Sequence, residues 1–191
     1  PVLMLKHGLI VRSQMFKVHQ AIGNPLSTVE RFSDWNIDEL IVLDIGHEAL
    51  GHDLRRDDLH QQYSGNRTID VLREISKVCC MPLTFGGGIR NTKDISERLA
   101  VGADKVTLNT AAVKNPELIT DAAKQFGSQC IVVSIDVKKE NGTWMVYKNF
   151  GKNSTNFTID EWISIVVSMG AGEILLQSID QDGRGNGYDL E

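Results

Sequence analysis

The feature that most constrains the fold of this chain is a regular alternation of short apolar runs with amphipathic stretches. Most of the runs are continuous rather than alternating with polar residues, which is typical of strands buried on both faces. The runs are Val2–Val11, Leu40–Ile45, Leu83–Phe85, Val106–Leu108, Ile131–Ile135 and Ile174–Ile179. Strands that alternate with helices in this way predict a parallel sheet with right-handed crossovers.

The stretches between the runs have the features of helices. Pro116–Phe126, for example, begins with Pro at a helix-entry position and is followed by Gly127. The expected helices are Ser27–Trp35, Thr68–Val78, Asn91–Val101, Pro116–Phe126 and Thr158–Met169. Two segments fall outside the alternation: Val137–Lys148, where Glu140-Asn141-Gly142 predicts a hairpin turn, and the polar segment Gly46–Arg67.

The composition is that of a globular protein and excludes several function classes. The chain has 191 residues, of which 41% are hydrophobic and 24% charged, with a formal net charge of −5. An acidic chain is a poor partner for nucleic acid, and no apolar run is long enough to span a membrane. Neighbouring Cys79 and Cys80, with Cys130, favour reduced thiols and a cytoplasmic protein.

Five consecutive apolar runs end in polar residues, at the strand ends where a (β/α)8 barrel carries its chemistry. These polar residues are Asp44, Gly86–Gly88, Asn109-Thr110, Asp136 and Asp180–Asp182. A single Asp after a strand is a helix cap about as often as it is a functional residue. Glycines let backbone N–H groups approach an anion, and an Asn/Thr pair caps the next turn, so the second and third groups suit a phosphate.

Charged residues precede three of the runs, at the opposite end of the expected strands. These are Glu39, Lys105 and Glu173, and the pattern alone favours a structural plug.

No metal site is expected. Asp180–Glu191 imitates a calcium loop, but Arg184 stands at a ligand position and a strand precedes it. The spacing of His47, Glu48, His52 and His60 favours a solvated loop.

Several segments resemble the cyclase subunit (HisF) of imidazole glycerol phosphate synthase along the length of the chain. They are Leu83–Arg90, Gly102–Val113, Phe126–Gln129, Ser134–Asp136, Gly170–Leu176, Ser178–Asp180, Asp182-Gly183 and Gly187–Asp189. The resemblance implies a phosphate-binding (β/α)8 barrel that receives ammonia from a glutaminase (HisH-like) subunit in a heterodimer. It implies no cofactor, no nucleic-acid partner and no membrane partner.

The resemblance also assigns roles to individual residues. Asp136 and Asp182 match catalytic positions. Substrate or phosphate binding is implied for Arg12, Gly87, Gly88, Asn109, Thr110 and Gly183. Glu39, Lys105 and Glu173 match the charged residues that gate the ammonia entrance, which reverses the structural interpretation of these three.

One departure from the family bears on function. The family has a catalytic Asp in its first strand where this chain has Met4, and Met cannot act as a general acid or base. Losing such a group costs ~10²–10⁴-fold in rate. The chain therefore looks more like a family branch associated with surface polysaccharide or lipopolysaccharide genes. The expected reaction is amidation of a phosphorylated or nucleotide-linked sugar, from acetamido to acetamidino.

Three alternatives remain open. The first is a histidine-biosynthesis cyclase with a rearranged acid, and the second is a non-catalytic scaffold that activates a glutaminase. The third is a phosphosugar isomerase barrel, for which the charges of Glu39, Lys105 and Glu173 have no purpose.

The length agrees with one domain over residues 1–191 but not with a whole barrel, which has ~250 residues. We expect a single partial barrel of about six strand–helix units in which the seventh and eighth strands are missing.

Overall fold

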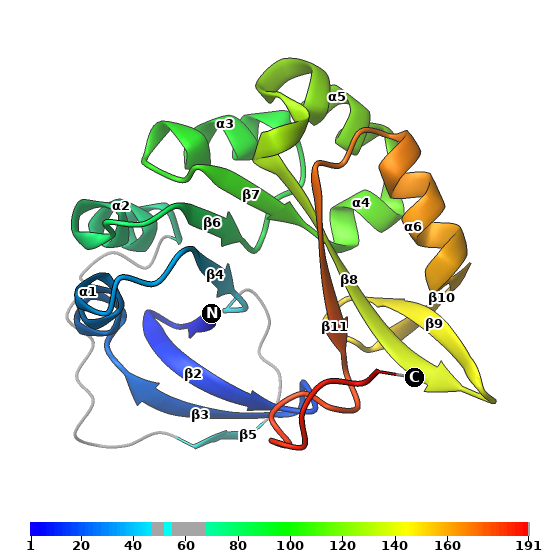
Figure 1. Cartoon of the computed structure of the whole chain (residues 1–191), viewed down its shortest axis with the longest axis horizontal. Helices are drawn as coiled ribbons and strands as arrows, with labels where there is room; N and C mark the ends of the chain where they lie inside the picture. Colours follow the sequence, from blue (N-terminus) through cyan, green and yellow to red (C-terminus); the bar gives the residue numbers. More distant parts are fainter. Residues whose placement is uncertain (47–51, 55–67, 191) are drawn as a thin grey trace. The chain divides into compact units, whose positions relative to one another are not determined.

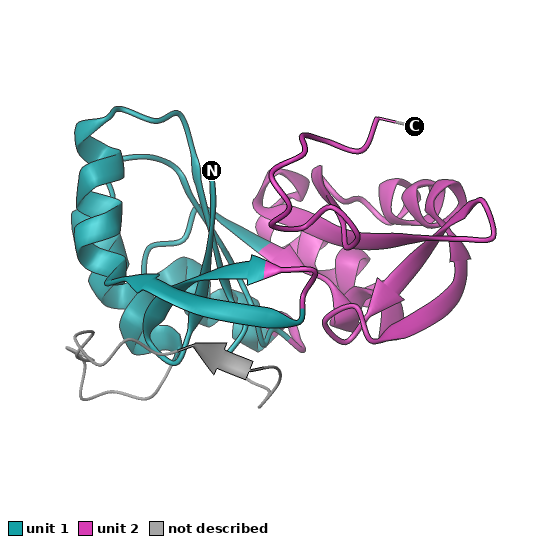
Figure 2. Cartoon of the chain, turned by 90° about the horizontal axis from the view of Figure 1, so that it is seen from below, with its two compact units in different colours: residues 1–13, 17–89, 93–106 teal, residues 14–16, 90–92, 107–191 magenta. Residues whose placement is uncertain are grey.

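The computed structural model describes residues 1–46, 52–54 and 68–190 (Figure 1). Within these ranges the chain is mixed α/β, with parallel strand pairing at its centre. It divides into two compact units (Figure 2). Unit 1 comprises residues 1–13, 17–89 and 93–106, and unit 2 comprises residues 14–16, 90–92 and 107–191.

Unit 1 is built on three parallel strands, in which β1 (Val2–Lys6) pairs with β4 (Leu40–Asp44) and β4 pairs with β6 (Leu83–Gly86). The sheet continues through β2 (Leu9–Gln14), β3 (Val18–Gly23) and β5 (His52–Leu54). The single strand predicted over Val2–Val11 is wrong. It is a hairpin, because His7 and Gly8 adopt φ of 51° and 78° and reverse the chain between β1 and β2.

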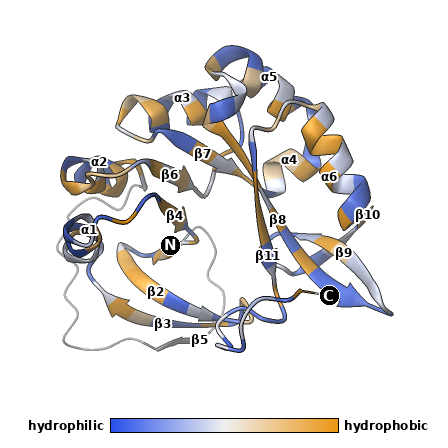
Figure 3. Ribbon diagram, in the orientation of Figure 1, coloured by the Kyte–Doolittle hydropathy of each residue, from blue (hydrophilic) through white to orange (hydrophobic). Residues whose placement is uncertain are grey.

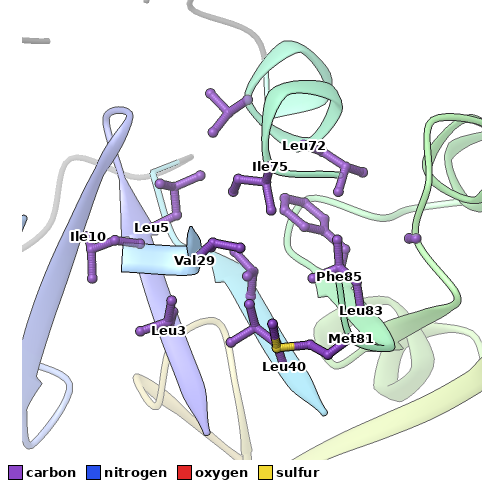
Figure 4. Packing of buried hydrophobic residues seen from close by; sticks show 13 residues of the cluster. Leu3, Leu5, Ile10, Val29, Leu40, Leu72, Ile75, Met81, Leu83 and Phe85 are labelled. Atoms are coloured by element: carbon purple, nitrogen blue, oxygen red, sulfur yellow. The ribbon is translucent and has the colours of Figure 1, made fainter. Parts of the chain in front are cut away.

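Three helices complete unit 1: α1 (Pro25–Asp34), α2 (Thr68–Val78) and α3 (Thr92–Ala100). Helix α1 begins two residues before the predicted Ser27, because Asn24 caps it by accepting a 2.9 Å hydrogen bond from Leu26 N. Apolar residues of α1 and α2 pack on the strands and form a buried core (Figure 4). The core includes Leu5, Val29, Leu40, Leu72, Ile75, Leu83 and Phe85.

Unit 2 is centred on the long strand β8 (Ile131–Glu140), which pairs in parallel with β11 (Glu173–Ser178). On its other side β8 forms an antiparallel hairpin with β9 (Thr143–Lys148), which pairs with β10 (Asn153–Thr158). The predicted turn at Asn141-Gly142 is confirmed, with φ of 49° and 85°. Strand β8 is buried from Ile131 to Val137 and hydrophilic at its end (Figure 3).

The chain passes from unit 1 to unit 2 within β7 (Lys105–Leu108). The helices of unit 2 are α4 (Thr110–Lys114), α5 (Glu117–Phe126) and α6 (Ile159–Ser168), and a 3₁₀ turn, η1 (Ser128–Cys130), follows α5. Helix α6 starts at a capping box, in which Thr158 and Glu161 bond each other's backbone N–H groups. No helix in the described ranges is long and apolar enough to cross a membrane.

The expectation of about six strand–helix units is not borne out in detail. The described residues contain eleven strands, because hairpins extend the parallel core at β2, β3, β9 and β10. Strand β10 has the sequence Asn-Ser-Thr-Asn-Phe-Thr. It contains no apolar run, so apolar patterning does not predict it. The parallel α/β core itself is confirmed.

Candidate active site

Asp136 is a buried carboxyl in unit 2. It lies within β8 and is only 6% exposed. Burial raises its pKa to about 7, and the negative charge of Asp182 acts in the same direction. Hydrogen bonds from the side chains of Asn109 and Ser134 oppose this shift, because they stabilise the charged form. A carboxyl with this pKa both accepts and donates a proton near neutral pH, which is the property of a general acid–base group.

The Asn109 side chain forms a hydrogen bond with Asp136 and does not cap helix α4. The prediction that the Asn109-Thr110 pair caps the following turn is wrong for Asn109, whose side chain makes no capping bond. Its backbone, with φ −130° and ψ −97°, directs the amide elsewhere, and Nδ2 donates a 2.9 Å hydrogen bond to Asp136 Oδ2. Thr110 Oγ1 accepts a 3.0 Å bond from Asn149 N, which ties it to the turn after β9.

Asp182 is held by main-chain and side-chain donors of the same unit. Phe16 N donates to its Oδ2 at 3.1 Å, and Gln177 Nε2 lies 3.4 Å from its Oδ1. Met15 N also donates to the main-chain oxygen of Asp182, at 3.0 Å. These bonds hold Asp182 within the turn of residues 179–184, which also contains Gly183, where φ is 67°. The structure therefore brings together Asn109, Asp136 and Asp182 in one unit, with Asp136 inside β8 rather than at the strand end where the sequence predicted it.

The glycine loop after β6 belongs to unit 1. Gly87 has φ of 110°, and a Cβ there would lie 2.1 Å from the main-chain oxygen of Asp44, so only glycine fits. Gly88 also has a positive φ, of 63°. Asp44 is 7% exposed, and its carboxylate accepts hydrogen bonds from Gly46 N and Thr68 Oγ1. Arg12 lies exposed on β2.

Two of the three predicted gate residues form an ion pair in unit 1. Lys105 Nζ lies 3.1 Å from Glu39 Oε1, and Thr84 Oγ1 donates to the same oxygen at 3.0 Å. Both charged side chains are partly exposed, at 20% and 36%. Glu173 is the first residue of β11 and belongs to unit 2. Glu39 directly precedes β4 and Lys105 begins β7, and β6, which carries Thr84, lies between these two strands in the sheet.

Three residues near the candidate site were not predicted. Ser134 stands two residues before Asp136 on β8 and therefore shares its face of the strand, so the two-residue period of a strand could have identified it. Gln177 pairs with Asp136 in the register of β8 and β11, and Phe16 contributes only its backbone. Neither has a local signal, because the partners are distant in sequence.

The residues weighed as metal ligands give no site in the described ranges. No group of three or more His, Cys, Asp or Glu residues there could hold a metal ion. His52 belongs to β5. His47, Glu48, His60 and Glu191 lie outside the described residues.

Comparison with known proteins gives the family. The family model described as "Histidine biosynthesis protein" matches residues 1–191. The chain is 42% identical over 192 residues to "Imidazole glycerol phosphate synthase subunit HisF" of Hydrogenobaculum sp. (strain Y04AAS1), covering 100% of the chain and 71% of the relative. Proteins of the same name from Geobacillus kaustophilus (strain HTA426) and Exiguobacterium sp. (strain ATCC BAA-1283 / AT1b) are 40% and 42% identical, with 71% and 69% of their lengths covered.

These relatives correct the expected function. The sugar-amidating function predicted from Met4 is wrong, because relatives that match the whole chain at about 40% identity are named imidazole glycerol phosphate synthase subunit HisF, and the family model is described as "Histidine biosynthesis protein". A single replaced residue weighs less than similarity along the whole chain. The chain therefore belongs to the histidine biosynthesis protein family and to its HisF group of enzyme subunits.

Proposed function

We propose that this chain is the cyclase subunit of an imidazole glycerol phosphate synthase, acting on a phosphorylated ribulotide with ammonia. The observation that carries the proposal is the buried Asp136 carboxyl, whose pKa is about 7, in a chain that is 40–42% identical to HisF proteins. Ammonia addition, elimination and ring closure each need a proton to be moved. A group that is half protonated near pH 7 suits all three steps.

Asp136 and Asp182 are the proposed catalytic residues. Met4 lies on β1 and cannot exchange a proton, so the two remaining carboxyls share the proton transfers. Burial keeps Asp136 protonated for part of the time, whereas Asp182 accepts hydrogen bonds from Phe16 N and Gln177 Nε2. Two interacting carboxyls in different environments can divide the acid and base roles between them.

We also propose phosphate or substrate binding at six residues, each supported by its surroundings. In unit 1, Gly87 and Gly88 have positive φ and no side chain, so their N–H groups are open to an anion. Arg12 supplies a positive charge on β2. In unit 2 the proposed residues are Asn109, Thr110 and Gly183, which stand beside the carboxyls of Asp136 and Asp182.

Ammonia entry is proposed at Glu39, Lys105 and Glu173, with a glutaminase subunit of the HisH type as the partner in a heterodimer. The support is the partly exposed Lys105–Glu39 ion pair, together with the word "subunit" in the names of the relatives. We further propose that residues 1–191 belong to one (β/α)8 barrel domain, supported by the parallel pairing of β1, β4 and β6 and of β8 and β11.

Turnover of the ribulotide with ammonium salts tests the proposal. We expect ammonium-dependent product, and Asp136→Asn should lower kcat by ~10²–10⁴-fold because its amide cannot transfer a proton. Asp121→Asn is the matched control, since Asp121 lies exposed on α5 in the same unit. Absence of ammonium-dependent product would overturn the proposal. Stimulation of a glutaminase that survives Asp136→Asn without such product would indicate a scaffold instead.

A further inference from the structure

Arg98 is a buried cation beside the glycine loop of unit 1. It lies in the last turn of α3 and is only 7% exposed. Its Nη1 donates a 2.8 Å hydrogen bond to the main-chain oxygen of Asp94, and its Nη2 donates a 3.1 Å bond to the main-chain oxygen of Gly87. One planar guanidinium thus joins the helix to the loop.

The opposite side of Gly87 is closed by β4. The space where a Cβ would lie is 2.1 Å from the Asp44 oxygen, so the loop backbone cannot move further toward that strand. Asp44 is itself held by Gly46 N and Thr68 Oγ1. Gly87 is therefore confined between the end of β4 and the Arg98 guanidinium.

This confinement sets the direction of one particular N–H group. The peptide between Gly87 and Gly88 is trans, and in a trans peptide the C=O and the following N–H point in opposite directions. Because Arg98 holds the Gly87 oxygen, the Gly88 N–H points away from the guanidinium. A cationic donor on the C=O also polarises the peptide unit and makes its N–H a stronger donor.

We infer that Arg98 is a positioning residue for anion binding by the glycine loop: it orients and polarises the Gly87–Gly88 peptide so that the Gly88 N–H binds a phosphate oxygen. The inference rests on the proposed phosphate binding by Gly87 and Gly88. Arg98 itself does not touch the phosphate. A lysine at this position keeps the charge but lacks the planar fork that reaches both Asp94 and Gly87.

The test compares Arg98→Met and Arg98→Lys with Arg73→Met, a control on the exposed face of α2 where Arg73 pairs with Asp70. We expect Arg98→Met to raise the KM for the ribulotide and the Ki of inorganic phosphate about tenfold, with kcat changed less than about threefold. Arg98→Lys should fall between Arg98→Met and wild type. Arg73→Met should match wild type in all three quantities.

A second measurement separates this inference from the proposed function. Titration with inorganic phosphate, followed by the Gly88 amide resonance in ¹⁵N-glycine-labelled protein, needs no turnover. We expect phosphate to shift that resonance in wild type. In Arg98→Met the apparent Kd for phosphate from the same titration should be about tenfold higher. A shift without cyclase turnover in wild type would overturn the proposed function but support this inference.

Two results would overturn the inference. The first is an unshifted Gly88 resonance in a wild-type protein that turns over its substrate. The second is a purely structural effect, in which the variants lower Tm while KM and the phosphate Ki stay at wild-type values. If Arg98→Met does not fold, Arg98→Lys, which keeps the positive charge, gives this comparison.

Discussion

Asn109 Nδ2 donates a 2.9 Å hydrogen bond to Oδ2 of Asp136, within unit 2. The bond stabilises the ionised carboxylate, whereas burial and the charge of Asp182 stabilise the protonated form. The pKa of Asp136, about 7, is the balance of these opposing effects, so it should respond to changes in either one.

Removing the amide should move the proton equilibrium of Asp136 upward. In Asn109→Ala the carboxylate loses a donor, so its pKa should rise above the wild-type value of about 7. Where catalysis needs the ionised form, the acid limb of the pH–kcat profile should shift to higher pH. ¹³C-detected titration of the Asp136 carboxyl checks the direction, and Asn115→Ala, at the end of α4, is the control. An unchanged or lower pKa would contradict this account.

Protein stability should fall as pH rises through the range in which Asp136 ionises. Its folded-state pKa of about 7 lies above the ordinary value of 3.8, so between these pH values the folded protein binds more protons than the unfolded chain. The free energy of unfolding therefore decreases from about pH 4 to about pH 7 on account of this group. Urea unfolding at pH 5 and pH 8 should show a smaller decrease for Asp136→Asn than for wild type. Equal decreases in the two proteins would show that burial of Asp136 has no such cost.

Gly87→Ala should lower the free energy of unfolding far more than an alanine substitution at a glycine that also has positive φ but open space around it. The new Cβ would lie 2.1 Å from the Asp44 oxygen, which adds a steric clash to an unfavourable backbone conformation. We expect a loss of roughly 3 kcal/mol or more in the free energy of unfolding. Gly142→Ala is the matched control, since Gly142 has φ of 85° and no atom within 4 Å of a built Cβ. It should cost only about 1 kcal/mol. Equal losses in denaturant unfolding would refute the role of the close approach.

Lys105→Ala should affect ammonia transfer more than stability. The Lys105–Glu39 pair is partly exposed, and such pairs contribute only ~0–1 kcal/mol. With the glutaminase subunit present, we expect more glutamine hydrolysed per product formed, because the ion pair no longer controls entry. The ratio of glutamate to product measures this, and Lys77→Ala, paired with Glu74 on the surface of α2, is the control. A ratio equal to that of wild type would count against a gate at this position.

Local signals in the sequence were sufficient for much of the fold. The turn at Asn141-Gly142, the helix over Thr68–Val78 and the buried strand that leads to Asp136 all follow from residues close together in the chain. Apolar period, capping residues and turn chemistry act over a few residues, so a single sequence is enough to recognise them. The same signals predicted a strand end at Asp136, but β8 continues past it to Glu140. The likeness to HisF rested on resemblance rather than on pattern.

The tertiary structure decided what those residues contact. Asn109 and Asp136 are 27 residues apart, and Phe16 N reaches an Asp182 oxygen 166 residues away. Arg98 meets the Gly87 oxygen only because α3 packs beside the loop. The sequence by itself determined the main helices and the strands of the parallel core, but not the reversal between β1 and β2 or the strand β10. Burial and long-range hydrogen bonds, which exist only once the chain has folded, decided the protonation of Asp136 and the orientation of the glycine loop.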